Sequence, residues 1–64
     1  MQIMFGWNRS EDGAVTVYAH DHDGRIAPVA VFRLQPLIDI LGMTRAEAKS
    51  MQEKFADLIV ENSK

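Results

Sequence analysis

Residues 12–24 read DGAVTVYAHDHDG, and this stretch decides the fold. Between its two Asp-Gly pairs the side chains alternate, with Val15, Val17 and Ala19 on one face and Thr16, Tyr18 and His20 on the other. This period of two predicts a β-strand over residues 14–20. Asp-Gly pairs supply the positive φ that tight hairpin turns require. We therefore expect the middle strand of an antiparallel meander, with a hairpin at each end.

The same pattern extends the sheet in both directions. Residues 2–8 predict a first strand that places Ile3, Phe5 and Trp7 on one face. Residues 25–34 predict a third strand. Proline has no N–H to donate to a neighbouring strand, so Pro28 predicts that this third strand lies at an edge or is broken there.

The predicted third strand is apolar on both of its faces. Val29 and Val31 lie on one face, and Ala30, Phe32 and Leu34 lie on the other. A single layer of helix covers only one face of a sheet. The second face is then a contact surface, because soluble monomers rarely expose large apolar patches. The sequence leaves open which face meets the helix.

Helical spacing begins after Gln35. Pro36 suits a first helical turn, and Gly42 suits the end of a short helix over 37–41. Thr44-Arg45-Ala46-Glu47 fits a capping box and predicts a long helix from about 45 to 62. The stripe of this helix consists of the apolar residues Ala48, Met51, Phe55, Leu58 and Ile59, and the polar Asn62 continues its spacing. We expect Met51, Phe55 and Leu58 to anchor it on the sheet.

Together these elements predict an α+β fold in a single domain, residues 1–64. A three-stranded antiparallel β-meander over about 2–34 precedes a helical part over about 36–62, with a short helix and one long C-terminal helix packed on one face. A chain of 64 residues without cysteine forms only a marginal core and has no disulfide to support it. We therefore expect self-association as a homodimer.

Charge and hydropathy exclude some classes of function. The net charge of −2 disfavours a free-standing nucleic-acid binder, which is usually basic. The longest apolar run, residues 27–32, is too short to cross a membrane. The first five residues include no basic segment, so no signal peptide is expected. We expect a cytoplasmic protein without a membrane partner.

Catalytic and metal-binding patterns are sparse. His20-Asp21-His22-Asp23 contains metal-ligand residue types, but the run lies in a predicted hairpin turn and offers too few ligands for a structural zinc site. The chain has no thiol nucleophile and no glycine-rich phosphate loop. We expect no catalytic residue, no metal and no cofactor, and therefore no enzyme.

The apolar second face and an acidic ridge of the long helix are the candidate interface. Its residues are Met4, Tyr18, Val29, Val31, Phe32, Glu53, Asp57 and Glu61. An acidic ridge favours a basic protein partner. The function predicted is that of a small non-catalytic binding or regulatory protein. Chains of this size are typical of accessory factors, including phage-encoded modulators of host machinery.

Two alternative functions remain. Residues 41–45 resemble the turn of a helix-turn-helix, which would make the chain a DNA-binding regulator. Its candidate DNA contacts are Arg45, Lys49, Ser50 and Gln52. The second alternative is a binder of a small ligand or nucleotide across a dimer interface.

Overall fold

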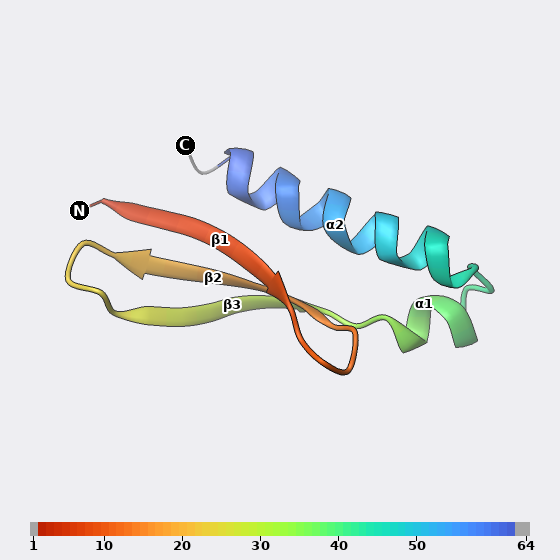
Figure 1. Cartoon of the computed structure of the whole chain (residues 1–64). Coiled ribbons are helices and arrows are strands. Elements are labelled where there is room, and N and C mark those ends of the chain that lie inside the picture. The colour runs from red at the N-terminus through yellow and green to blue at the C-terminus, as the bar shows by residue number, and fades with distance from the viewer. Residues whose placement is uncertain (1, 63–64) are drawn as a thin grey trace.

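Five elements follow one another in residues 2–62, the part of the chain that the computed structural model describes (Figure 1). The strands are β1 (Ile3–Arg9), β2 (Val15–Asp21) and β3 (Ile26–Phe32). The helices are α1 (Gln35–Asp39) and α2 (Arg45–Asn62). The strands form one antiparallel sheet in the order β1-β2-β3. The predicted α+β fold, with the second strand in the middle, is confirmed.

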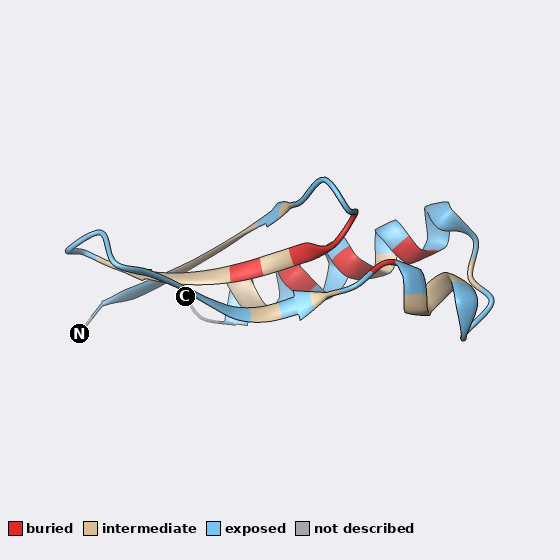
Figure 2. Cartoon of the chain, turned by 90° about the horizontal axis from the view of Figure 1, so that it is seen from below, coloured by how far each residue is buried: buried red, intermediate tan, exposed pale blue. Residues whose placement is uncertain are grey.

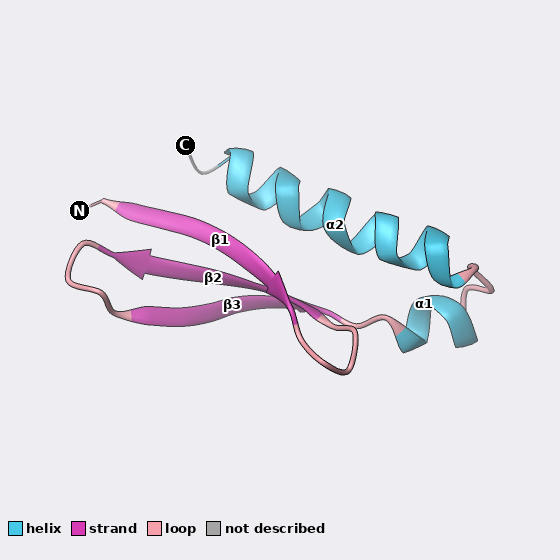
Figure 3. Ribbon diagram, in the orientation of Figure 1, coloured by secondary structure: helices cyan, strands magenta, loops and turns pink. Residues whose placement is uncertain are grey.

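Figure 3 shows the two hairpin turns as loops that join the three strands. Both turns have a glycine with positive φ, as the sequence predicts. Gly13 and Gly24 take φ values of 90° and 85°. In the first turn the Asp12 carboxylate accepts the backbone N–H of Ala14 at 3.1 Å. In the second, the Asp21 carboxylate accepts two backbone N–H groups of its own turn at 3.0 Å. Each aspartate therefore holds its turn closed through the backbone.

A β-bulge interrupts β3 at its proline. Val17 of β2 pairs with Ala30, whereas the next residue, Tyr18, pairs with Pro28. Val29 is therefore the extra residue of the bulge. A bulge leaves one residue outside the regular pairing, so it accommodates a residue that cannot donate a hydrogen bond. Strand β3 is both an edge strand and irregular at Pro28, as the sequence predicts.

The structure decides which face of the sheet is the core. Val15 and Val17 of β2 are completely buried, together with Ala56 of α2. Figure 2 shows these buried residues on β2 and on the facing side of α2. Four partly buried residues surround this cluster from the neighbouring strands: Phe5, Trp7, Ala30 and Phe32. The face that carries Ala30 and Phe32 is therefore covered, and the opposite face has no helix over it.

Helix α2 meets the sheet through small residues, one polar residue and the partly buried Ile59. Ala48, Gln52 and Ala56 are the residues of α2 that are buried. Phe55 and Leu58 remain 47% and 44% exposed. The expectation that these two large residues anchor the helix is wrong. Alanine lets the helix backbone approach the two valines of β2 closely, and larger side chains are displaced to the flank.

Gln52 joins the helix to the sheet by hydrogen bonds rather than by apolar contact. Its side chain is 1% exposed, and its Nε2 donates to the carbonyl oxygens of Phe32 at 2.7 Å and Gly13 at 3.1 Å. Its Oε1 accepts from Nη1 of Arg9 at 2.7 Å. Nη2 of the same arginine pairs with Glu53 at 2.9 Å. These bonds fix α2 against the ends of β1 and β3, because a buried amide tolerates few other arrangements.

The capping box of α2 is present with both of its hydrogen bonds. The Thr44 backbone N–H donates to Oε1 of Glu47 at 2.9 Å, and the Glu47 backbone N–H donates to the Thr44 hydroxyl oxygen at 3.1 Å. The hydrogen bond from the Thr44 backbone lowers the pKa of the Glu47 carboxyl below its usual value of 4.5. The cap therefore favours the ionised carboxylate.

A titration of stability tests this cap. A carboxyl whose pKa is lower in the folded state contributes stability above its unfolded pKa, and that contribution is lost as pH falls through the folded pKa. We expect the urea midpoint of the wild type to fall between about pH 6 and about pH 3 more than that of Glu47→Gln. Glu11→Gln, in the exposed first hairpin turn, is the control and keeps the wild-type profile. Identical profiles for Glu47→Gln and the wild type would contradict the assignment.

Candidate functional site

The face of the sheet opposite α2 carries apolar side chains where polar ones are usual. Antiparallel sheets that face water on one side normally place polar residues there. Here Met4, Ile26 and Val31 are 62%, 66% and 57% exposed. We call this surface the open sheet face, and its central residues are Met4, Gly6, Tyr18, His20, Ile26 and Val31. Val29, the extra residue of the bulge, is 52% exposed beside it.

A shallow hollow lies in the middle of the open sheet face. It has a volume of about 280 Å³, and its walls include Tyr18, His20 and Ile26. Gly6 pairs directly with Tyr18 across the strands and contributes no side chain. A Cβ added at Gly6 would meet no other described atom within 4 Å. The absence of a side chain at Gly6 therefore leaves this space open. The phenol of Tyr18 and the imidazole of His20 line its rim.

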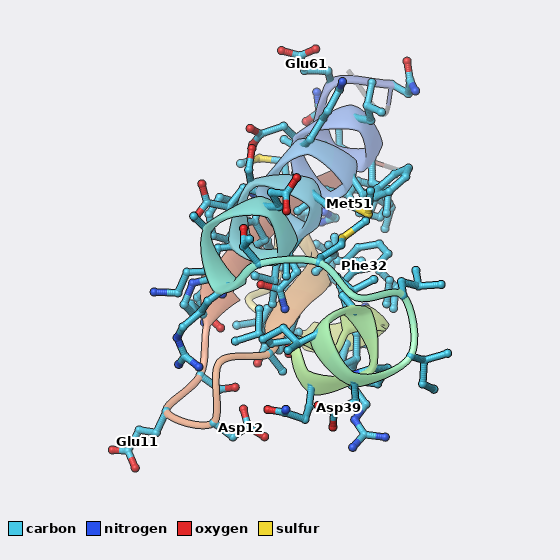
Figure 4. All side chains as sticks on the ribbon, turned by 90° about the vertical axis from the view of Figure 1, so that its right-hand side faces the viewer. Glu11, Asp12, Phe32, Asp39, Met51 and Glu61 are labelled. Atoms are coloured by element: carbon cyan, nitrogen blue, oxygen red, sulfur yellow. The ribbon has the colours of Figure 1, made fainter. Side chains whose placement is uncertain are left out.

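A second depression, which we call the α2 groove, lies between β3, α1 and α2. Helix α2 packs mainly against β1 and β2, which leaves the core side of β3 partly uncovered. The rings of Phe32 and Phe55 stack there with centroids 6.1 Å apart. Figure 4 shows Phe32 and Met51 beside each other above α1. The groove has a volume of about 420 Å³, and its other apolar lining residues are Val31, Pro36 and Leu37.

The apolar part of the predicted interface divides between two surfaces. Met4, Tyr18 and Val31 lie on the open sheet face, and Val29 lies beside them at the bulge. Phe32 lies on the covered face, where it contacts the core cluster and lines the α2 groove. The sequence left open which face of β3 meets the helix. In the structure Val29 and Val31 are exposed, whereas Ala30 and Phe32 pack against the core.

The predicted acidic ridge of α2 is largely engaged with the sheet. Glu53 accepts from Arg9, and Asp57 accepts a hydrogen bond from the indole Nε1 of Trp7 at 2.9 Å. Glu61 is exposed near the end of the helix. Arg9 partly neutralises Glu53, whereas the indole of Trp7 is uncharged and leaves the charge of Asp57 in place. The ridge therefore still presents the carboxylates of Asp57 and Glu61 to a partner.

The structure also places the candidate DNA contacts. Arg45, Lys49 and Ser50 are exposed on α2. The assignment of Gln52 as a surface contact is corrected, because its amide is buried and bonded to backbone carbonyls. Helix α1 has 5 residues, so it is less than two turns long. Because the first helix is short and Gln52 is buried, a helix-turn-helix here would present only a small surface to DNA.

The second hairpin turn holds its carboxylates with an arginine. Nε of Arg25 lies 2.9 Å from Asp21, and its Nη2 lies 3.3 Å from Asp23. Nε2 of His22 lies 3.5 Å from the other oxygen of Asp23. Within residues 2–62, no group of three or more His, Asp or Glu side chains is arranged to hold a metal ion. No helix in that range is long and apolar enough to cross a membrane.

Sequence reasoning missed the residues that shape both depressions. The alternation in residues 2–8 predicts a strand but no special role for Gly6. A glycine inside a strand nevertheless often marks a place where another group approaches the backbone. Met51 and Leu37 look like ordinary core residues, yet they line the α2 groove. The signal that could have revealed Gly6 is its position opposite an aromatic residue, which depends on knowing the strand register.

Comparisons with known proteins do not add a family to this description. No family model matches the sequence, and neither a curated protein nor a solved structure matches it. The proposals below therefore rest on the geometry of the two apolar surfaces.

Proposed function

We propose that this chain is a small non-catalytic protein that binds a protein partner through its open sheet face. The observation that supports this function is the set of side chains more than half exposed there, Met4, Ile26 and Val31. Burying one such side chain contributes about 1.5–3 kcal/mol. Ile26 lines the hollow, and Met4 and Val31 extend the exposed apolar surface of the same sheet face, so their burial supports binding of a partner there.

The shape of the hollow supports a protein partner over a small ligand. Pockets for drug-sized molecules usually enclose about 300–1,000 Å³ and surround most of the ligand. The hollow at Gly6 measures about 280 Å³ and opens onto a flat sheet. It suits one apolar anchor side chain of a larger surface, with a hydrogen-bond acceptor near the Tyr18 hydroxyl. The chain's net charge of −2 favours a basic partner during encounter.

Such a protein regulates by occupying its partner's surface. No bond is made or broken, so affinity and specificity depend on the fit around Gly6 and on the exposed apolar side chains. This is the mode of action of an accessory modulator, the role that the size of the chain first suggests.

Filling the hollow tests this proposal. In Gly6→Val the new side chain enters open space, and valine is favoured in strands, so stability stays equal or rises by up to about 1 kcal/mol. We expect partners captured by the wild type to be lost by Gly6→Val and retained by Lys49→Ala. With the purified partner, calorimetry should show at least a tenfold weaker dissociation constant for Gly6→Val.

The DNA-binding alternative has a separate readout. Fluorescence anisotropy with duplex DNA at low salt measures it directly, because phosphate contacts dominate there. DNA binding that is weakened by Arg45→Ala and Lys49→Ala, and unchanged by Gly6→Val, would overturn the proposed function. Partner capture that is unaffected by Gly6→Val would also overturn it.

A further inference from the structure

We propose that two copies of this chain associate through the α2 groove, with the α2 helices antiparallel across a two-fold axis. This inference uses a different surface from the proposed function, and the two share only Val31, at their border. It depends on the shape of the monomer, on the flank of α2 beside β3, and on the charges beside that flank.

The monomer is more open than a chain of its size should be. Its accessible surface is 4742 Å², whereas a folded monomer of 7.2 kDa typically exposes about 4,100 Å². Its radius of gyration is 12.9 Å, against about 10.7 Å for a compact domain of this length. Two copies that each removed an excess of about 600 Å² would bury about 1,200 Å², the lower end of specific interfaces.

The flank of α2 beside β3 is where a second helix fits. Met51, Phe55 and Leu58 follow one another at spacings of four and three along this flank, and the last two are about half exposed. That spacing is the seam that one helix presents to another. Because α2 packs mainly on β1 and β2, a helix placed beside it would cover Phe32 and the uncovered side of β3.

The charges at the edge of this seam match those of a second copy when the two helices are antiparallel. Lys54 and Glu61 lie seven residues apart and share a surface with Leu58. Seven residues correspond to about 10.5 Å along a helix, so they do not pair within one copy. In an antiparallel pair in which Phe55 meets the partner copy's Leu58, each Lys54 lies beside the other copy's Glu61. The two-fold axis then makes both ion pairs at once.

This arrangement leaves the open sheet face on the outside of the dimer. Each copy completes the helical layer of the other, and both hollows at Gly6 stay accessible. Self-association and partner binding are therefore separable by mutation, and neither proposal depends on the other.

Sedimentation equilibrium over a range of concentrations tests the dimer. We expect the wild type to approach twice 7.2 kDa and Leu58→Glu to remain at 7.2 kDa with a folded circular-dichroism spectrum. Val29→Glu is the matched control, since Val29 is similarly exposed on the other side of the sheet, and it should dimerise normally. A wild type that stays monomeric to high micromolar concentration overturns the proposal. A dimer lost in Val29→Glu and kept in Leu58→Glu also overturns it.

A charge exchange tests the antiparallel orientation. Lys54→Glu and Glu61→Lys should each raise the dissociation constant of the dimer by about tenfold, because two symmetric ion pairs become repulsive. The double variant should regain most of the wild-type affinity, because each copy again offers both charges. Additive weakening in the double variant would overturn the antiparallel pairing.

Discussion

Replacing Gln52 by methionine is expected to lower the free energy of unfolding by about 3 kcal/mol. Methionine keeps the length of the side chain and removes its amide. The Phe32 carbonyl then loses its donor, and Arg9 loses a buried acceptor. A buried polar group left without a partner costs about 1–3 kcal/mol. Arg9 keeps the Gly13 carbonyl and Glu53 as acceptors, so the Phe32 carbonyl accounts for most of the loss. In a domain of this size the melting temperature should fall by roughly 12–24 °C.

Two comparisons make this prediction specific. Ser50→Met changes an exposed neighbour on the same helix and should stay within about 0.5 kcal/mol of the wild type. Phe55→Ala should cost the monomer only about 1–2 kcal/mol, because Phe55 is already half exposed. Thermal and urea unfolding rank the three variants by their loss in free energy of unfolding. At protein concentrations below the dissociation constant of the proposed dimer, a larger loss for Phe55→Ala than for Gln52→Met would mean that apolar packing, and not the amide, anchors α2.

Ala56→Leu is the second substitution with a large expected effect. Ala56 is completely buried against Val15 and Val17, so a leucine there has no space without moving the helix away from the sheet. Overpacking of this kind costs about 1–3 kcal/mol. The displaced helix would also strain the hydrogen bonds of Gln52, so we expect the upper end of this range.

Ala46→Leu is the matched control for this overpacking. Ala46 is exposed on the same helix, and leucine and alanine have similar helix propensities. The control should therefore melt near the wild type, while Ala56→Leu melts roughly 10–20 °C lower. Equal melting temperatures for the two variants would show that α2 does not sit at this close distance from β2.

Local patterns predicted every element of the fold. Alternation in residues 14–20, the two Asp-Gly turns and the Thr44–Glu47 cap are short-range signals, and each works through backbone conformation or neighbouring hydrogen bonds. They act the same way whatever the rest of the chain does. For that reason the strands and α2 lie within one or two residues of their predicted bounds.

The candidate site could be predicted only in part. The apolar strand face predicts a contact surface at Met4, Tyr18, Val29, Val31 and Phe32, and the structure places the first four on or beside the open sheet face. The hollow at Gly6 could not be predicted, because it depends on the register that sets this glycine opposite an aromatic ring. The α2 groove could not be predicted either, because it depends on how far α2 extends over β3.

The sequence by itself determined the order and type of the elements, since these follow from periodicity and turn residues. Only the tertiary structure decided which side of α2 is buried. A hydrophobic stripe predicts burial of the large residues Met51, Phe55 and Leu58. The side that is actually buried is the one that allows close approach and that donates to backbone carbonyls at the edge of the sheet. Alanines allow the approach, and Gln52 supplies donors for the carbonyls of Gly13 and Phe32. Neither requirement is visible until the sheet that imposes it has formed.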